Sequence, residues 1–185
     1  MATDVPTPSP PFVVSKFDKE RHDRTGFSSG HGPMDNFLKS SLSDQIKAGM
    51  VAAYVATLEG RATVLGYYTL GAMAVRASLG PNKWQKARLP DSPVIYVRAV
   101  AVRKDMQGQG LGTALVVDAI KRCVALSQSL GAAAIVLDVL EDEQFLRRQQ
   151  FYANLGFRSL GDPENPNRVL LPMVDARKTL GGSCA

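Results

Sequence analysis

The segment Gln107-Gly108-Gln109-Gly110-Leu111-Gly112 decides how this chain folds and what it can bind. It follows an apolar stretch, 94–102, that is typical of a strand, and it precedes an apolar stretch, 111–130, that is typical of a helix. Glycines let a backbone come close to phosphate oxygens, and the first turn of a helix offers unpaired N–H groups and the positive end of its dipole. The segment is therefore a candidate loop for binding a diphosphate.

Two well-known phosphate-binding loops fit these residues less well. A P-loop carries a lysine and a serine or threonine directly after its last glycine, whereas Gly112 is followed by Thr113 and Ala114. A Rossmann turn has a G-x-G-x-x-G spacing and an acidic residue about twenty positions later, where this chain has Leu130 and Gly131. A Rossmann turn is therefore the weaker alternative, and a glycine-rich turn without a ligand is another.

A second motif, Phe151-Tyr152-Ala153-Asn154-Leu155-Gly156-Phe157, follows at a distance that one helix and one strand would fill. Together the motifs resemble the signatures of the GNAT acetyltransferases, a Gln/Arg-x-x-Gly-x-Gly/Ala loop and an F-Y-x-x-x-G-F segment, in the same order. The resemblance implies an acetyltransferase with acetyl-CoA as co-substrate. It also implies that the pyrophosphate of acetyl-CoA is bound by the loop residues Gln107, Gly108, Gln109, Gly110, Leu111, Gly112 and Thr113.

The composition is that of one globular domain, with 185 residues of which 45% are apolar and 21% are charged. Residues 1–11 are rich in Pro, Ser and Thr, and we expect them to form a disordered tail before an acetyltransferase domain at 12–176. A flexible C-terminal tail is expected at 177–185. No apolar run approaches the roughly 18 residues that cross a bilayer, and the N-terminus does not resemble a signal peptide, so we expect a cytoplasmic protein without membrane contact.

The GNAT resemblance implies an α+β fold with a central mixed, mostly antiparallel sheet that contains a splayed parallel pair and is flanked by helices. The hydrophobic pattern predicts helices at 34–49, 111–130 and 142–155, and a polar loop between 74 and 94 that contains Pro81 and Pro90. The same pattern predicts strands at 12–17, 51–58, 63–74, 94–102, 132–140, 157–160 and 168–173.

In GNAT folds the two central parallel strands splay apart and leave backbone groups of the earlier strand unpaired. The pantetheine amides of the cofactor bind there like an added strand. By this resemblance, Val100, Ala101 and Val102 are cofactor-binding residues. The residues alone predict only a buried strand at 94–102 that pairs normally on both sides.

Tyr152 is the residue to which the resemblance assigns the chemistry. When an amine attacks the acetyl thioester, CoA leaves as a thiolate, and a hydroxyl that supplies a proton makes it a better leaving group. A tyrosine with a pKa of about 10 is protonated at neutral pH and can donate. The alternative is that Tyr152 is a packed helix aromatic beside Phe151 and Phe157.

The general base is open. Some GNAT enzymes carry a glutamate on the cofactor strand, but 94–102 has no carboxylate, and its only charged residue is Arg98. Asp138 on the next strand is a candidate base, with a solvated or salt-bridged strand end as its alternative. If the acceptor is an α-amine, whose pKa is about 7.7–8.0, it is substantially neutral at working pH and water is a sufficient base.

The N-terminal half resembles one GNAT branch, the acetyltransferase toxins of bacterial type II toxin-antitoxin modules. Those toxins acetylate the α-amine of aminoacyl-tRNA and block translation. The matching segments are Phe27-Ser28-Ser29-Gly30 before Met34-Asp35-Asn36-Phe37-Leu38, then Gln45-Ile46-Lys47-Ala48-Gly49, Gly66-Tyr67-Tyr68-Thr69-Leu70, and Leu89-Pro90 before Val97-Arg98-Ala99-Val100-Ala101-Val102. A small-molecule or protein amine is the alternative acceptor, and a non-catalytic acetyl-CoA-binding module is a third hypothesis.

This chain departs from the branch at three places. Ser29 stands where a cysteine is usual, Met34 stands where a leucine is usual, and residues 144–150 hold a few extra positions that could reshape the acceptor cleft. Arg98 is a candidate ligand for a phosphate of the tRNA, with a salt-bridged strand arginine as the alternative. The branch also implies a ribbon-helix-helix antitoxin as a partner and allows a homodimer.

The charge of the chain agrees with an acidic partner without choosing one. The formal net charge is +5 and the isoelectric point is about 9.4, which favours CoA phosphates or nucleic acid. His22 and His31 have no Cys or carboxylate neighbours at metal-ligand spacing, so we predict no metal. Part of the positive charge gathers around the cofactor strand and predicts a local functional patch of Lys83, Lys86, Arg88, Arg98, Arg103 and Lys104.

Overall fold

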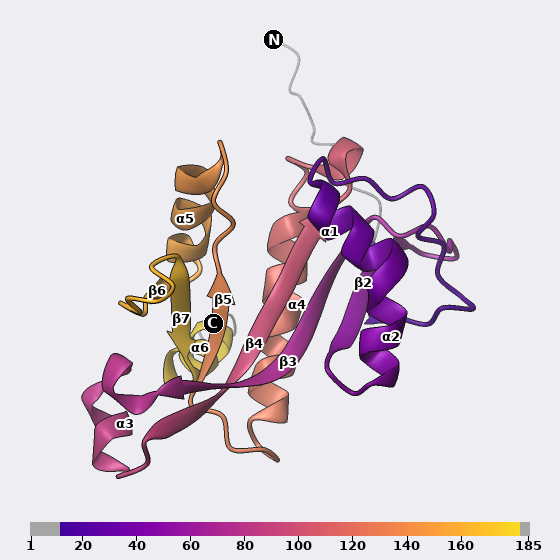
Figure 1. Ribbon diagram of the computed structural model, residues 1–185. Coiled ribbons are helices and arrows are strands. Elements are labelled where there is room, and N and C mark those ends of the chain that lie inside the picture. The colour runs from indigo at the N-terminus through magenta and orange to yellow at the C-terminus, as the bar shows by residue number, and fades with distance from the viewer. Residues whose placement is uncertain (1–11, 182–185) are drawn as a thin grey trace.

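A single mixed sheet organises the protein. The computed structural model describes residues 12–181, so the expected N-terminal tail and residues 182–185 lie outside the described residues. Seven strands lie in the order β1-β2-β3-β4-β5-β7-β6, and the pairing of β4 with β5 is the parallel one (Figure 1). The strands are β1 (Phe12–Lys16), β2 (Ala52–Leu58), β3 (Gly66–Arg76), β4 (Asp91–Val102), β5 (Ala134–Asp138), β6 (Arg158–Ser159) and β7 (Arg168–Pro172).

Helices cover both faces of this sheet. On one face α4 and α6 pack over β3, β4, β5 and β7 around a core that includes Leu111, Leu115 and Ile135. On the other face the N-terminal helical segment packs its buried Leu38 and Leu42 against the middle of the sheet. The helices are α1 (Gly32–Asn36), the π-helical η1 (Phe37–Ser41), α2 (Leu42–Lys47), the 3-10 turns η2 (Ala77–Leu79) and η3 (Lys104–Met106), α3 (Asn82–Lys86), α4 (Leu111–Leu126), α5 (Phe145–Asn154) and α6 (Met173–Gly181).

The parallel pair of strands separates halfway along β4. Pairing with β5 covers only Val94 to Val97, whereas pairing with β3 continues to Val102, which lies opposite Gly66. The register of β3 and β4 shifts at this point, because Thr69 faces Ala99 while Leu70 faces Val97. Arg98 is therefore the extra residue of a bulge, a feature that bends and twists a strand. The splay that the GNAT resemblance implied is confirmed, and the strand that pairs normally on both sides, which the residues alone predicted, is not found.

Three expectations about the elements were wrong. The C-terminal tail does not start at 177, because α6 continues to Gly181 with Ala176 fully buried against the core. The polar loop before β4 contains η2 and α3, which Trp84 anchors by burial next to Val75 and Val94. Helices α4 and α5 are shorter than predicted, and α5 starts at Phe145 rather than 142.

Candidate active site

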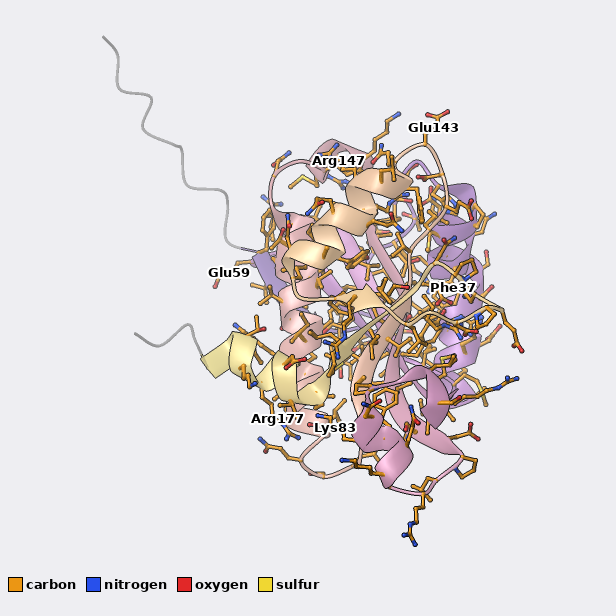
Figure 2. All side chains as sticks on the ribbon, turned by 90° about the vertical axis from the view of Figure 1, so that its left-hand side faces the viewer. Phe37, Glu59, Lys83, Glu143, Arg147 and Arg177 are labelled. Carbon is orange, nitrogen blue, oxygen red and sulfur yellow. The ribbon has the colours of Figure 1, made fainter. Side chains whose placement is uncertain are left out.

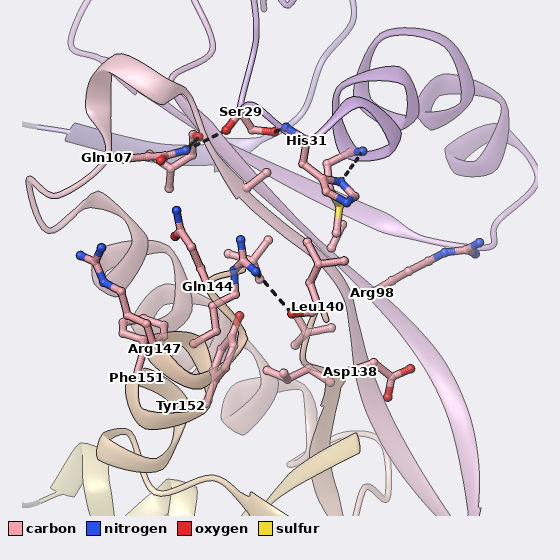
Figure 3. A pocket seen from close by; sticks show the side chains of 18 of the residues that line it. Ser29, His31, Arg98, Gln107, Asp138, Leu140, Gln144, Arg147, Phe151 and Tyr152 are labelled. Carbon is pink, nitrogen blue, oxygen red and sulfur yellow. Dashed lines mark hydrogen bonds between the residues drawn. The ribbon is translucent and has the colours of Figure 1, made fainter. Parts of the chain in front are cut away.

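A cavity of about 480 Å³ opens between the separated ends of β4 and β5 (Figure 3). Its walls come from the loop before α1 and α1 itself, from β4, from the glycine loop, from β5 and the segment after it, and from α5. The lining residues are Ser29, His31, Met34, Val97, Arg98, Ala99, Val100, Ala101, Val102, Gln107, Gly108, Leu137, Asp138, Leu140, Gln144, Arg147, Arg148, Phe151 and Tyr152.

The glycine loop has the backbone that a diphosphate site needs. Gly108 and Gly110 have φ of 76° and 83°, in the left-handed region that favours glycine, and Gly110 immediately precedes α4. The first hydrogen bond of that helix runs from the N–H of Ala114 to the carbonyl of Gly110 at 3.0 Å. Within residues 12–181, the backbone N–H groups of 108–113 donate to no protein acceptor. They are free to bind an anion, as the sequence predicted.

The side chains of the two loop glutamines bind backbone carbonyls of the protein. Gln107 donates from Nε2 to the carbonyls of Ser29 and Val102, both at 2.9 Å, and Gln109 donates from Nε2 to the carbonyl of Asp105 at 2.9 Å. A contact of Gln109 with a diphosphate would therefore come from its backbone, whereas the backbone N–H of Gln107 donates to the carbonyl of Lys104 at 3.4 Å. The assignment of Gln107 to Thr113 to cofactor binding stays a prediction.

Tyr152 lines the cavity and packs in the core at the same time. Its ring makes edge contacts with Phe151, at a centroid distance of 5.1 Å, and with Phe157, at 5.7 Å. Figure 3 shows the hydroxyl pointing from α5 towards the cavity. Burial raises the pKa of Tyr152 to about 12, although the nearby Arg148 opposes the shift. The phenol is therefore protonated at neutral pH and can act only as a proton donor.

Arg148 lies one helical turn before Tyr152 and was missed in the sequence. Its guanidinium donates to the carbonyl of Leu140 at 3.3 Å and forms an ion pair with Asp142, and both partners belong to the segment between β5 and α5. Arg147 and Gln144 also line the cavity from this helix. The extra positions noted at 144–150 in the sequence were the one sign that Gln144, Arg147 and Arg148 could line the acceptor cleft.

Asp138 is held in an ion pair. Its carboxylate accepts two hydrogen bonds from Arg168, at 2.7 and 3.0 Å, and one from the hydroxyl of Tyr96 at 2.9 Å. Burial alone would raise its pKa, but the hydrogen bonds from Arg168 and Tyr96 hold the pKa of Asp138 below its usual value. Of its two predicted roles, the salt-bridged strand end is the one that the geometry supports.

Arg98 leaves the sheet at the bulge and turns towards the N-terminal helices. Its guanidinium donates to the amide oxygen of Gln45 at 3.2 Å and lies 5.8 Å from the ring centroid of Phe37. Among the described residues no carboxylate pairs with it. The alternative of a salt-bridged strand arginine is therefore wrong, and the positive charge is available at the rim of the cavity.

The basic residues between 83 and 104 do not form one patch. Lys83 and Lys86 lie on α3, beside the start of β4, whereas Arg103 and Lys104 follow the end of this strand (Figure 1). Figure 2 shows Lys83 far from Arg147, which lines the cavity. Arg103 is paired with Asp105 at 2.6 Å. The prediction of a single functional patch was wrong, because β4 is twelve residues long and separates positions that are near in sequence.

Two features are absent from residues 12–181. No group of three or more His, Cys, Asp or Glu side chains there is arranged to hold a metal ion. None of the helices described has both the length and the apolar composition required to span a membrane.

A family profile for the acetyltransferase (GNAT) domain matches residues 51–159, which include the glycine loop, the splayed strands and Tyr152. The chain therefore belongs to the GNAT acetyltransferases, and it is an acyltransferase enzyme. Its homologues in that family include named toxins. It is 35% identical over 161 residues to a tRNA-acetylating toxin of Mycobacterium tuberculosis (strain ATCC 25618 / H37Rv), a match that covers 86% of this chain and 91% of the relative. It is 29% identical over 174 residues to a probable toxin TacT of Sinorhizobium fredii (strain NBRC 101917 / NGR234), covering 91% and 95%.

Solved structures of toxins have the same fold. A tyrosine-to-phenylalanine mutant of KacT superposes with a TM-score of 0.81 at 23% identity and covers 90% of this chain and 98% of its own. AtaT in complex with acetyl-methionyl-tRNAfMet gives a TM-score of 0.80 at 24% identity and covers 92% and 99%. AtaT has also been solved with acetyl-CoA and with the C-terminus of its antitoxin AtaR. These structures confirm the GNAT fold for the chain.

Proposed function

We propose that this chain is a toxin that transfers the acetyl group of acetyl-CoA to the α-amine of aminoacyl-tRNA and thereby blocks translation. The observation that carries the proposal is the 35% identity with a tRNA-acetylating toxin over 86% of the chain. The lining of the cavity agrees with it, because Arg98 and Arg147 present positive charge and the carboxylate of Asp138 is already paired. A free cationic amine would instead favour an acidic acceptor pocket.

The splay and the glycine loop suit acetyl-CoA. The free N–H groups of 108–113 would bind the diphosphate, and the end of β4 at Val100, Ala101 and Val102, which β5 does not pair, would bind the pantetheine amides. Acetyl-CoA supplies the activated acetyl group as a thioester. Bound in this way, its sulfur would lie inside the cavity that Tyr152 lines.

Tyr152 acts as the general acid in this proposal. The neutral α-amine attacks the thioester carbonyl, a C–N bond forms and the C–S bond breaks. Tyr152 gives its proton to the departing sulfur, while the nitrogen loses a proton to water and the phenolate is reprotonated. A dedicated carboxylate base is unnecessary because a substantial fraction of an α-amine with a pKa of about 7.7–8.0 is neutral at working pH.

Two partners follow from the proposal. An antitoxin is expected to cover the cavity, since the C-terminus of AtaR is bound to the structural neighbour AtaT. We expect it to have a ribbon-helix-helix domain, and we expect the toxin to form a homodimer. Because charged tRNA is the acceptor, the site of action is the cytoplasm.

The test uses acetyl-CoA labelled in its acetyl group with charged tRNA, uncharged tRNA and a mixture of small amines as separate acceptors. The wild type should label the charged tRNA alone, and Tyr152→Phe should reduce the label by about 10²–10⁴-fold. Label on small amines but not on charged tRNA would reject the toxin proposal and keep the acetyltransferase.

A further inference from the structure

The side chain of Gln107 joins two parts of the cavity that are far apart in sequence. Both N–H groups of an amide can donate, and Nε2 of Gln107 donates to the carbonyl of Val102 at the end of β4 and to the carbonyl of Ser29 in the loop before α1. Figure 3 shows the bond to Ser29 crossing from the glycine loop to that loop. No donor of this amide is left for a ligand.

Ser29 is fixed in turn to α1. Its N–H and its hydroxyl both donate to Oδ1 of Asp35, at 2.8 and 2.6 Å, and Asp35 lies in α1. The carbonyl of Ser28 accepts from the N–H of Lys104 at 2.8 Å, which is a second link to the segment after β4. The loop and α1 therefore form one connected segment. Gln107 and Lys104 hold the loop, while Tyr67 of β3 donates to the carbonyl of Met34 at 2.8 Å and holds α1 itself.

The segment held in this way forms one wall of the cavity. His31 and Met34 line the cavity from it. Figure 3 shows His31 on the side opposite Tyr152 and α5. Val102, the other partner of Gln107, lies on the strand end that the proposed function assigns to acetyl-CoA. The amide of Gln107 thus joins the end of the cofactor strand directly to the loop that leads into the wall of His31 and Met34.

We infer that Gln107 is a positioning residue, which holds the His31–Met34 wall against the cofactor strand and so determines how well the acceptor binds, and that its side chain is not a ligand of the diphosphate. The inference deepens the proposed function and rests on it for the identity of the acceptor. The two readings of Gln107 predict different kinetic defects. A positioning residue acts on the KM of the acceptor, whereas a diphosphate ligand acts on the affinity for acetyl-CoA.

The chain offers matched variants for this test. Gln107→Met keeps the length of the side chain and removes both donors, and Gln109→Met removes an equivalent donor whose bond stays within the loop, to Asp105. Gln107→Arg restores N–H donors at the same position. For each variant, calorimetry gives the Kd of acetyl-CoA, steady-state transfer to charged tRNA gives KM and kcat, and hydrogen exchange reports on the amides of residues 28–36.

Gln107→Met should raise the acceptor KM about threefold to tenfold, the size of one lost hydrogen bond, since the link from Ser28 to Lys104 remains. It should also speed exchange at 28–36 and leave the Kd of acetyl-CoA within about twofold of wild type. Gln109→Met should leave the exchange at 28–36 unchanged, and Gln107→Arg should recover both the KM and the exchange.

Other outcomes overturn the inference. A weaker affinity of Gln107→Met for acetyl-CoA with unchanged exchange at 28–36 would make the side chain a diphosphate ligand, and unchanged exchange together with an unchanged KM would leave it no positioning role. Failure of the proposed function looks different. In that case the wild type does not label charged tRNA, while the exchange at 28–36 still reports whether Gln107 holds the wall.

Discussion

Arg168 and Asp138 form a two-point ion pair between neighbouring strands, with Nε to Oδ1 at 2.7 Å and Nη2 to Oδ2 at 3.0 Å. Among the described residues Asp138 is the only carboxylate that lines the cavity, and Tyr96 donates a further hydrogen bond to it. A carboxylate with three donors and a lowered pKa is a weak base. The pair therefore stabilises the sheet beside the cavity, and under the proposed function we expect water to deprotonate the amine.

Asp138→Asn should destabilise the protein by about 1–3 kcal/mol at pH 7, because it removes the two-point partner of a partly buried Arg168 and leaves it only the ion pair with Asp162 at 3.2 Å. The folded-state pKa of Asp138 is below the unfolded value of about 3.9, so the pair stabilises the protein above that pH. The difference in free energy of unfolding between wild type and variant should therefore shrink as the pH falls through the folded-state pKa. Denaturant unfolding between pH 7 and pH 2 measures it.

The same variant separates structure from catalysis. If Asp138 only supports the sheet, the pH dependence of kcat/KM for Asp138→Asn should keep the shape of the wild-type profile. Loss of the acidic limb in the variant would show that Asp138 is the general base after all.

The pH profile also tests Tyr152. Because the pKa of Tyr152 is raised to about 12, the phenol should remain protonated, and kcat should show no loss from its ionisation up to about pH 10. Stopped-flow measurement of thiol release across pH 6 to 10 checks this. An alkaline fall in kcat with an apparent pKa near 8 or 9, which Tyr152→Phe abolishes, would show that the phenol ionises far more easily than its burial implies.

Two glycines of the loop should differ in their tolerance of alanine. Gly110 has φ of 83°, so Gly110→Ala strains the turn and should weaken acetyl-CoA binding about tenfold or more. Gly112 lies in the first turn of α4, and a Cβ there would meet Val102 at 3.8 Å, an ordinary contact. Gly112→Ala should change the Kd of acetyl-CoA by less than about threefold. Equal losses for both variants in a calorimetric titration would contradict the assignment of the loop.

Arg98 should act on tRNA and not on acetyl-CoA. Removing one phosphate contact should weaken the binding of tRNA and lower the slope of log Kd against log salt by about one unit. Arg98→Gln is the variant, and Lys83→Gln, on the distant α3, is its matched control. Fluorescence anisotropy of labelled tRNA over a salt series measures the slope. The same slope for Arg98→Gln and wild type would remove Arg98 from the tRNA-binding surface.

The sequence predicted those parts of the site that lie on continuous segments. Three of these parts were recognised from neighbouring residues alone: the loop that starts at Gln107, the strand β4 over 94–102, and the helix α5 with Tyr152. Helix α3 was missed because two prolines bracket it and its only anchor is the buried Trp84. Helix α6 was missed because the Gly and Ser residues near its end favour a flexible tail, whereas in the structure α6 packs on α4.

The remaining wall of the cavity depends on tertiary contacts. This wall carries Ser29, His31 and Met34, which line the cavity because α1 and the loop before it pack near the end of β4. No local sequence pattern encodes that packing. The departure at Ser29 has a structural consequence here, since its hydroxyl donates to Asp35 at 2.6 Å. The bond from Gln107 to Ser29 joins residues 78 positions apart, so only the folded chain could show it.

The most direct measurement is the mass of the 3′-terminal aminoacyl-adenosine released by ribonuclease from charged tRNA after incubation with the enzyme and acetyl-CoA. We expect the wild type to yield aminoacyl-adenosine carrying one acetyl group on its α-amine, and Tyr152→Phe to yield almost none at the same time point. Unmodified aminoacyl-adenosine from the wild type, in a reaction where acetyl-CoA is consumed on another amine, would contradict the account.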